Sequence, residues 1–261
     1  MELLFRYRKQ NTKIRNMKNL KLKLMNSLKQ KNIAFLAVLL AVFSLTSCLK
    51  NDNDYATPNY AALSVINASP KLEKFDFVID NQLVNNDAFN FTERLPYFNI
   101  YSGSRRIGIY KDDTTDSLRT GTLIAQPGKI YSLYVVGEAP NHEFLTITDS
   151  LASPTTGKAQ VRFLNLSVNA PSLNLNYGAD STLFSNVAYK GYSDFVEIPG
   201  GKKYNFSVGT EANIASGSGN IATESNVMIE SGKIYTIWAK GIYDETTVDS
   251  LKLGLKIQKN N

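Results

Sequence analysis

The sequence predicts an all-β protein in which a secretory signal precedes two tandem β-sandwich domains. Short stretches alternate between apolar and polar residues at the period of two that a half-buried strand requires. Clusters of Pro, Gly, Asn and Asp separate these stretches about every eight to twelve residues, as in β-sandwiches. Landmarks in the first half of the body recur 98 to 104 residues later. No stretch after residue 48 shows a sustained helical period.

The first 47 residues have the layout of a secretory signal. They carry ten Lys or Arg residues against one acid, Glu2, and then an uninterrupted apolar run of eleven residues at 33–43. A stable membrane-spanning helix needs about 20 apolar residues, so we expect a cleaved signal peptide at 1–47 and not a retained anchor. Met17 and Met25 would each begin a more compact signal, and the choice among the starts stays open.

Cys48 is the one cysteine of the chain, and it comes shortly after the apolar run. Leu45-Thr46-Ser47-Cys48 resembles the bacterial lipobox, with a leucine three residues before the cysteine and small residues between. The resemblance implies cleavage before Cys48 and acylation of its thiol, and two or more acyl chains anchor a protein stably where one is marginal. A buried structural cysteine is the weaker alternative, because no second thiol exists to pair with it.

Residues 48–59 are expected to form the lipidated cysteine and a polar tether. Leu49-Lys50-Asn51-Asp52-Asn53-Asp54 resembles the export signal of Bacteroidetes lipoproteins, in which a lysine followed by acids directs the protein to the outside of the outer membrane. The resemblance implies an outer-membrane, lipid-anchored and surface-exposed protein. A plain solvated tether is the simpler interpretation, and both can hold.

The basic character of the chain belongs to its signal. The whole sequence has 29 basic and 23 acidic residues, whereas residues 48–261 have 19 and 22, a net charge near −3 with His142 neutral. A nucleic-acid partner would require a clustered basic face, so we expect none. Without a second cysteine, each domain depends on core burial, which about a hundred residues can supply.

An internal repeat divides the body into two domains. Residues 61–70 align with 159–167, and residues 128–137 align with 232–241. The offset drifts only from 98 to 104 residues, as expected of related domains with small loop insertions. We therefore place one sandwich at 60–152 and the other at 158–258.

The strands follow from alternation and turn residues. Each domain is expected to open with an apolar strand, at 63–66 and 161–164, and to continue with an alternating strand, at 75–79 and 173–177. Pro199-Gly200-Gly201 separates the stretch 195–198 from the alternating stretch 203–208, which predicts a hairpin. The stretches 98–103 and 105–110 predict the same hairpin in the first domain.

These motifs together resemble the DUF4397 domain of bacterial secreted and surface proteins. The resemblance rests on Asn-Ala-Ser-Pro at 67–70, the strand at 76–80, Pro-Gly-Gly at 199–201, and Gly-Lys-Ile-Tyr at 128–131 and 232–235. Two copies would cover nearly all of the body, although the second has residues 165–171 in place of a compact Ala-Ser-Pro. The resemblance implies an Ig-like or related sandwich and brings no established activity or catalytic residues.

The sequence offers little for catalysis or metal binding. His142 is the only histidine and lies in a polar stretch, so we expect a solvated loop residue; no Gly-x-Ser-x-Gly elbow is present. A calcium site of the EF-hand type is not expected, because the acidic stretches 52–54 and 112–113 have neither the spacing nor the glycine of that loop. A zinc site is not expected either, because the chain has too few Cys and His residues to coordinate the ion. We predict no enzymatic activity, no metal and no cofactor.

Two aromatic residues are the candidate ligand-binding residues. On the strand after Gly232, Trp238 shares a face with Thr236 and Lys240, and Tyr134 occupies the equivalent position in the first repeat. Because the neighbouring residues on this strand face are polar, we predict that both rings point away from the sandwich cores. They are interpreted either as a platform on which a sugar stacks, or as packing under a loop or against the neighbouring domain.

Five tripeptides resemble the O-glycosylation signal of Bacteroidetes, which is Asp, then Ser or Thr, then a residue such as Leu or Thr. About one match is expected by chance at ordinary residue frequencies, so five are suggestive, although Asp-Ser and Asp-Thr are also common turn pairs. The candidate acceptors are Thr114, Ser117, Ser150, Ser181 and Ser250.

The leading functional hypothesis is a non-enzymatic, lipid-anchored envelope protein that binds a glycan or another envelope protein. The second is a structural or assembly component of a surface fibre, in which a sheet edge pairs with another chain. A hydrolase is the third and least supported. Apart from the membrane that holds the lipid, the expected partners are therefore a glycan or an envelope protein.

Overall fold

The computed structural model describes residues 59–87, 89–178, 181–212, 220–244 and 246–261. Cys48, the predicted signal peptide and nearly all of the predicted tether lie outside these residues, so lipidation and export stay predictions. Within the described ranges, no helix combines the length and the hydropathy needed to cross a membrane.

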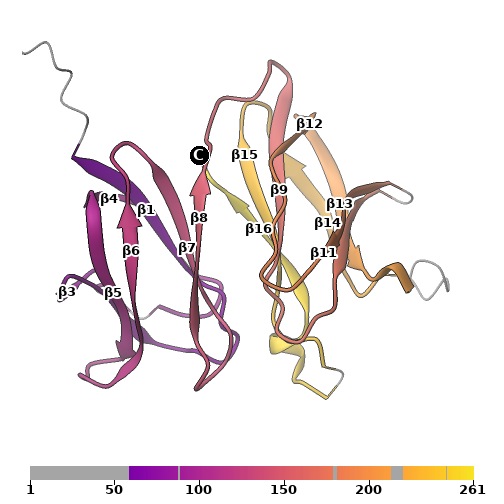
Figure 1. Ribbon diagram of the computed structural model, residues 1–261. Coiled ribbons are helices and arrows are strands. Elements are labelled where there is room, and N and C mark those ends of the chain that lie inside the picture. The colour runs from indigo at the N-terminus through magenta and orange to yellow at the C-terminus, as the bar shows by residue number, and fades with distance from the viewer. Residues whose placement is uncertain (1–58, 88, 179–180, 213–219, 245) are drawn as a thin grey trace, which may run out of the picture. The chain divides into compact units, whose positions relative to one another are not determined.

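The strands β1–β8 form the first sandwich (Figure 1). Its two four-stranded sheets have the orders β4-β1-β7-β8, here the β1 sheet, and β3-β2-β5-β6, here the β2 sheet. The strands are β1 (Tyr60–Asn67), β2 (Phe75–Ile79), β3 (Gln82–Leu83), β4 (Arg94–Tyr101), β5 (Gly103–Lys111), β6 (Ser117–Ala125), β7 (Ile130–Val136) and β8 (Glu143–Asp149).

The strands β9–β16 form the second sandwich (Figure 1). Its sheets have the orders β12-β9-β15-β16, here the β9 sheet, and β11-β10-β13-β14, here the β10 sheet. The elements are β9 (Lys158–Asn165), β10 (Leu173–Tyr177), β11 (Thr182–Val187), β12 (Val196–Pro199), β13 (Lys202–Gly209), β14 (Ala222–Ile229), β15 (Ile234–Lys240), the short 3₁₀ turn η1 (Asp249–Leu251) and β16 (Gly254–Lys259).

Both sandwiches have the same strand order, because each strand of the second occupies the place of the strand eight positions earlier in the first. In each, the opening strand pairs in parallel with the strand that follows the Gly-Lys motif, β1 with β7 and β9 with β15. The predicted all-β fold class with two Ig-like sandwiches is confirmed.

Each sandwich has its own core, to which both of its sheets contribute. Leu63, Phe77 and Leu133 lie in the first core, and Val161, Phe206 and Ile237 lie in the second; all are fully buried. The strand β2 alternates between buried and half-buried residues, as its sequence predicts. In β7 and β15 nearly all residues are buried, including those whose side chains point away from the sandwich core. Each of these strands therefore contacts a second apolar layer on its outer face.

The repeated Gly-Lys-Ile-Tyr motif has a physical explanation. Gly128 and Gly232 adopt φ of 71° and 76°, a left-handed conformation that glycine adopts without steric cost. The hydroxyl groups of Tyr131 and Tyr235 each accept a hydrogen bond from a backbone N–H five residues upstream, at 3.0 and 3.1 Å. The tyrosines therefore fix the turn that leads into β7 and β15.

A second repeated residue closes the end of the opening strand. Asn67 and Asn165 are fully buried. The Asn67 side-chain amide donates to the carbonyl oxygens of Leu72, at 2.7 Å, and Phe89, at 3.3 Å. Asn165 makes the two equivalent bonds, to Pro171 and Val187, both at 3.0 Å. In each sandwich this amide binds two carbonyl oxygens beyond the opening strand, and in the first sandwich both bonds are buried, so that these carbonyls would otherwise be unpaired.

The two predicted hairpins are wrong. The strands β4 and β5 flank the first turn, but β4 pairs with β1, whereas β5 pairs with β2 and β6. The strands β12 and β13 behave in the same way. At each site the chain crosses from one sheet to the other, because turn residues indicate where a chain reverses and not which strands then pair.

Candidate functional site

Tyr134 and Trp238 point away from the two sandwich cores, but they do not form a platform open to solvent. Both side chains are fully buried, and their rings meet edge to face with centroids 6.3 Å apart. They belong to a third apolar cluster, here the junction cluster, which unites side chains of the β1 and β9 sheets: Ile66, Ala68, Tyr134, Val136, Ile147, Leu164, Leu166 and Trp238. The packing interpretation therefore replaces the stacking platform.

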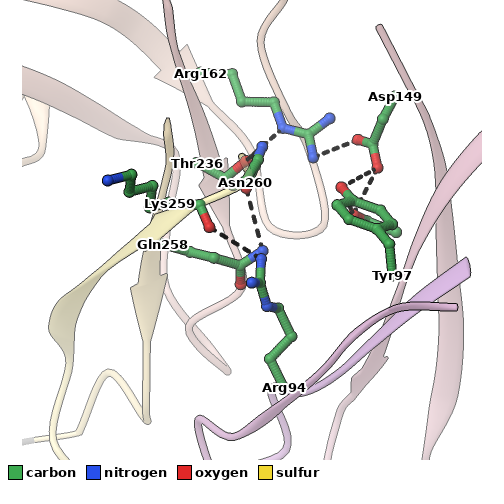
Figure 2. Close-up of polar contacts among 9 residues, drawn as sticks. Arg94, Tyr97, Asp149, Arg162, Thr236, Gln258, Lys259 and Asn260 are labelled. Carbon is green, nitrogen blue, oxygen red and sulfur yellow. Dashed lines mark hydrogen bonds and ion pairs between the residues drawn. The ribbon is translucent and has the colours of Figure 1, made fainter. Parts of the chain in front are cut away.

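A buried ion pair lies in the same junction (Figure 2). The Arg162 Nη2 atom lies 2.6 Å from the Asp149 Oδ1 atom, and the two side chains are 2% and 0% exposed. Arg162 also donates from Nε to the hydroxyl of Thr236 at 2.9 Å. The other carboxylate oxygen of Asp149 accepts hydrogen bonds from Tyr97, at 2.8 Å, and Ser132, at 2.7 Å.

These groups are paired with one another across the junction. Burial raises the pKa of Tyr97, and the negative charge of Asp149 raises it further. Burial likewise raises the pKa of Tyr134 to about 12. Both tyrosines therefore stay neutral near pH 7, and the paired charges of Arg162 and Asp149 compensate each other. The arrangement joins the β1 and β9 sheets.

His142 is buried, and the expectation of a solvated loop residue is wrong. The residue is 4% exposed, and its Nδ1 atom lies 3.4 Å from the hydroxyl oxygen of Ser69. Burial lowers the pKa of His142, which favours the neutral imidazole near pH 7. Ser69 donates its hydroxyl proton to the carbonyl of Gly137 at 2.7 Å, so this serine is not activated by the histidine.

The candidate modification sites lie on the surface. Thr114, Ser117, Ser150, Ser181 and Ser250 are all exposed, and whether they carry glycans stays a prediction. The aspartate of the Ser150 motif is the buried Asp149. For metals, the described residues contain no group of three His, Cys, Asp or Glu side chains that could hold an ion.

A hollow of about 520 Å³ opens on the first sandwich, at the edge where β3 and β4 lie. We call it the tyrosine hollow; its lining includes Tyr60, Asp80, Leu83, Asn99, Tyr101 and Arg105. Tyr60 and Tyr101 are cross-strand partners on β1 and β4, with ring centroids 5.4 Å apart. They are 47% and 64% exposed, and Leu83 is 55% exposed. Of the eight large exposed hydrophobic side chains among the described residues, three thus lie together at this hollow.

The tyrosine hollow also carries an ion pair. Arg105 Nη1 lies 2.8 Å from Asp80 Oδ2, and the side chains are 26% and 40% exposed. The other oxygen of Asp80 accepts the backbone N–H of Arg106 at 2.9 Å. Asp80 and Asn81 have φ of 48° and 68°, the left-handed conformations of a two-residue hairpin turn between β2 and β3. The turn therefore fixes the carboxylate at the hollow.

Sequence patterns did not indicate this site, because its members are far apart in the chain. Tyr60 begins β1 and Tyr101 ends β4, and only the antiparallel register of these strands brings the two rings together. A tyrosine at the outer end of each of two strands was the available signal. Its meaning depended on knowing that β4 pairs with β1 instead of β5.

The comparisons with solved structures give low similarity. One match is the family CBM26 module CBMbc of Eubacterium rectale Amy13K in complex with maltoheptaose, at 12% identity and a TM-score of 0.25, covering 73% of this chain and 100% of that one. Another is a streptococcal virulence factor described by its α-glucan binding, at 10% identity and a TM-score of 0.24, covering 68% and 92%. A third is a putative adhesin from Bacteroides ovatus, at 9% identity and a TM-score of 0.17, covering 77% and 95%. At these TM-scores the alignments do not establish a shared fold.

No curated protein matches the sequence. A protein family does match part of it. The match is to DUF4397, described as a domain of unknown function, and it covers residues 61–176. This range begins at the second residue of β1, includes the rest of the first sandwich and extends into β10 of the second. That the second sandwich is another copy of this domain stays a prediction, although its strand order is the same. Over residues 61–176, then, the chain is similar to the DUF4397 domain.

Proposed function

We propose that this protein is a lipid-anchored binding module of the bacterial cell envelope, which binds a glycan in the tyrosine hollow and has no catalytic activity. The observation that carries the proposal is the contact of two exposed tyrosine rings beside a partly exposed ion pair. A sugar ring has C–H groups on its faces and hydroxyl groups around its edge. It therefore needs apolar and polar surface side by side, which is the usual composition of a small-molecule site.

The envelope location is supported by the sequence around Cys48. The lipobox-like motif and the lysine-acid tract after it favour a lipid anchor and export to the cell surface. Tyr60, which lines the hollow, is the first residue of β1 and follows Asn59, where the described structure begins. A binding site on the first sandwich would thus be joined to the anchor by residues 49–59 alone. Such a tether spans at most roughly 40 Å when fully extended.

A glycan array with three proteins tests the binding site. The wild type should bind a defined set of glycans, and Tyr101→Ala should weaken this binding at least about tenfold, because removing an anchoring aromatic costs roughly 2 kcal/mol. Tyr243→Ala is the matched control, since Tyr243 is 39% exposed and does not line the hollow. Equal binding by the wild type and Tyr101→Ala would refute the site.

The anchor is tested separately. Cys48→Ser should abolish incorporation of labelled palmitate and release the protein from the membrane fraction. Protease treatment of intact cells should degrade the wild type if it faces outward. An unlabelled wild type that still sediments with membranes would contradict the proposed lipidation.

Assembly through a sheet edge receives less support. The strand β4 forms the edge beside the hollow, and it contains Pro96. Proline has no N–H to donate to an added strand and is one of the residues by which natural edges avoid pairing. Filaments in the purified protein, together with no binding on the glycan array, would nevertheless favour assembly over glycan recognition.

A further inference from the structure

We infer that the ion pair of Asp80 and Arg105 makes the tyrosine hollow selective for uncharged glycans that present neighbouring hydroxyl groups. This inference rests on the proposed function and adds the class of glycan. It depends on the charges that line the hollow, on the hydrogen-bonding positions that remain unused, and on the way the turn holds the pair in place.

The hollow has no net charge. Asp80 and Arg105 are the two charged residues among its described lining residues, and they neutralise each other at 2.8 Å. A glycan carboxylate would have to approach the carboxylate of Asp80 or displace it from Arg105. A uronic acid therefore gains no net attraction here and meets a like charge, which disfavours it.

The pair still has hydrogen-bonding capacity. Each oxygen of Asp80 accepts one hydrogen bond within the described structure and has room for another. Arg105 uses Nη1 for Asp80, and no hydrogen bond from its Nη2 occurs in the described structure. The side chains are 40% and 26% exposed, so a ligand can reach them. A sugar hydroxyl can donate to the carboxylate while its neighbour accepts from the guanidinium.

Arg105 is held at the hollow at some cost to stability. Its Nε atom is buried and has no acceptor among the described residues, and a buried unpaired donor is unfavourable. The turn does not require the arginine, since Asp80 is already fixed by the N–H of Arg106. A binding role explains why a costly side chain lies here.

The stacking surface is adjacent to the pair. Tyr101 and Tyr60 line the same hollow as Asp80 and Arg105. A pyranose ring that packs on a tyrosine directs its hydroxyl groups sideways, in the plane of the sugar. The rings would thus provide affinity, and the ion pair would select among sugars by charge and by the presence of adjacent hydroxyls.

The experiment compares neutral and acidic members of the same sugar series. Binding of glucose-, galactose- and mannose-based oligosaccharides is measured by titration calorimetry against the corresponding glucuronate, galacturonate and mannuronate oligosaccharides. The wild type should bind a neutral oligosaccharide at least about tenfold more tightly than its uronate counterpart. Arg105→Gln should weaken binding of the neutral sugar about tenfold.

The informative variant is Asp80→Asn. Asparagine keeps an oxygen that can accept the N–H of Arg106 and tolerates the positive φ of this position. The substitution leaves Arg105 unpaired, so the neutral-to-uronate ratio should fall at least about tenfold. Asp116→Asn, which removes an exposed charge from the loop between β5 and β6, is the control and should leave the ratio unchanged. Thermal unfolding of each variant checks that it is folded.

A wild type that prefers uronates, or an unchanged ratio in Asp80→Asn, overturns the inference while leaving Tyr101-dependent glycan binding intact. Binding that survives Tyr101→Ala undiminished indicates instead that the proposed site is wrong. Absence of binding to every neutral and acidic probe overturns both.

Discussion

The buried ion pair between Asp149 and Arg162 makes a quantitative prediction. Replacing Arg162 by methionine preserves much of the side-chain volume but removes the charge. Asp149, whose side chain is 0% exposed, would keep the hydrogen bonds from Tyr97 and Ser132 on one oxygen and lose the cation beside the other. An uncompensated buried charge typically costs about 3–5 kcal/mol, and we expect a loss of that size in the free energy of unfolding.

A second ion pair of the chain provides the matched control. Lys190 Nζ lies 2.7 Å from Glu143 Oε1, but these side chains are 32% and 50% exposed. Solvent screens such a pair, so Lys190→Met should cost no more than about 1 kcal/mol. The two substitutions remove the same kind of charge and differ mainly in burial.

Urea unfolding is the suitable assay, because the chain has a single tryptophan, Trp238, and it lies in the junction cluster. Its fluorescence reports the junction, while far-ultraviolet circular dichroism reports the strands. If the junction opens before the sandwiches unfold, the two transitions of Arg162→Met will separate. A double variant, Asp149→Leu with Arg162→Met, should recover most of the lost stability, since it leaves no unpaired charge. A cost for Arg162→Met no larger than that for Lys190→Met would refute the reasoning.

Three further predictions concern single residues. Tyr134→Phe should be nearly neutral at pH 7, because the Tyr134 hydroxyl makes no hydrogen bond among the described residues. In the wild type, the Tyr134 hydroxyl has a pKa near 10 in the unfolded chain and about 12 in the folded chain. The free energy of unfolding should therefore fall by roughly 3 kcal/mol between these two pH values. Urea titrations at alkaline pH should show a smaller fall in Tyr134→Phe, which lacks this hydroxyl. Asn67→Ala should lower the free energy of unfolding by about 2–4 kcal/mol, because two buried carbonyls lose their donor; a loss under 1 kcal/mol would contradict this. Gly200→Ala should lower the melting temperature, because the new Cβ would lie 2.5 Å from the Cα of Ser231 and force the backbone to shift. An unchanged melting temperature would contradict this, since it would mean that the backbone between β12 and β13 shifts without loss of stability.

Much of the fold followed from local patterns. The alternation in β2 follows from the pleat of a strand, which sends neighbouring side chains to opposite faces. The repeated Gly-Lys-Ile-Tyr motif predicted equivalent strands, and β7 and β15 occupy the same place in their sheets. The direction of Tyr134 and Trp238 could be predicted for the same reason, because it depends only on alternation along one strand.

The pairing of strands and the burial of side chains could not be predicted in this way. The turn at Pro199-Gly200-Gly201 was recognised, but its flanking strands belong to different sheets, since each finds its partner among strands distant in sequence. Trp238 was assigned to a polar face, yet that face packs against the ring of Tyr134. Polar neighbours such as Thr236 do not indicate exposure when they bond to a buried partner, here Arg162.

The amino-acid sequence by itself determined the period of two, the repeat, and the chemistry available to the chain, including a single thiol at Cys48 and a single histidine. These are properties of residue order and type, which local sterics convert into strands and turns. The tertiary structure alone decided which surfaces are buried and which are free. It brought Tyr60 and Tyr101 together across 41 positions of sequence and enclosed Asp149 with Arg162. Proximity between distant residues depends on how whole sheets pack, because burying apolar surface is a collective effect that no short segment specifies.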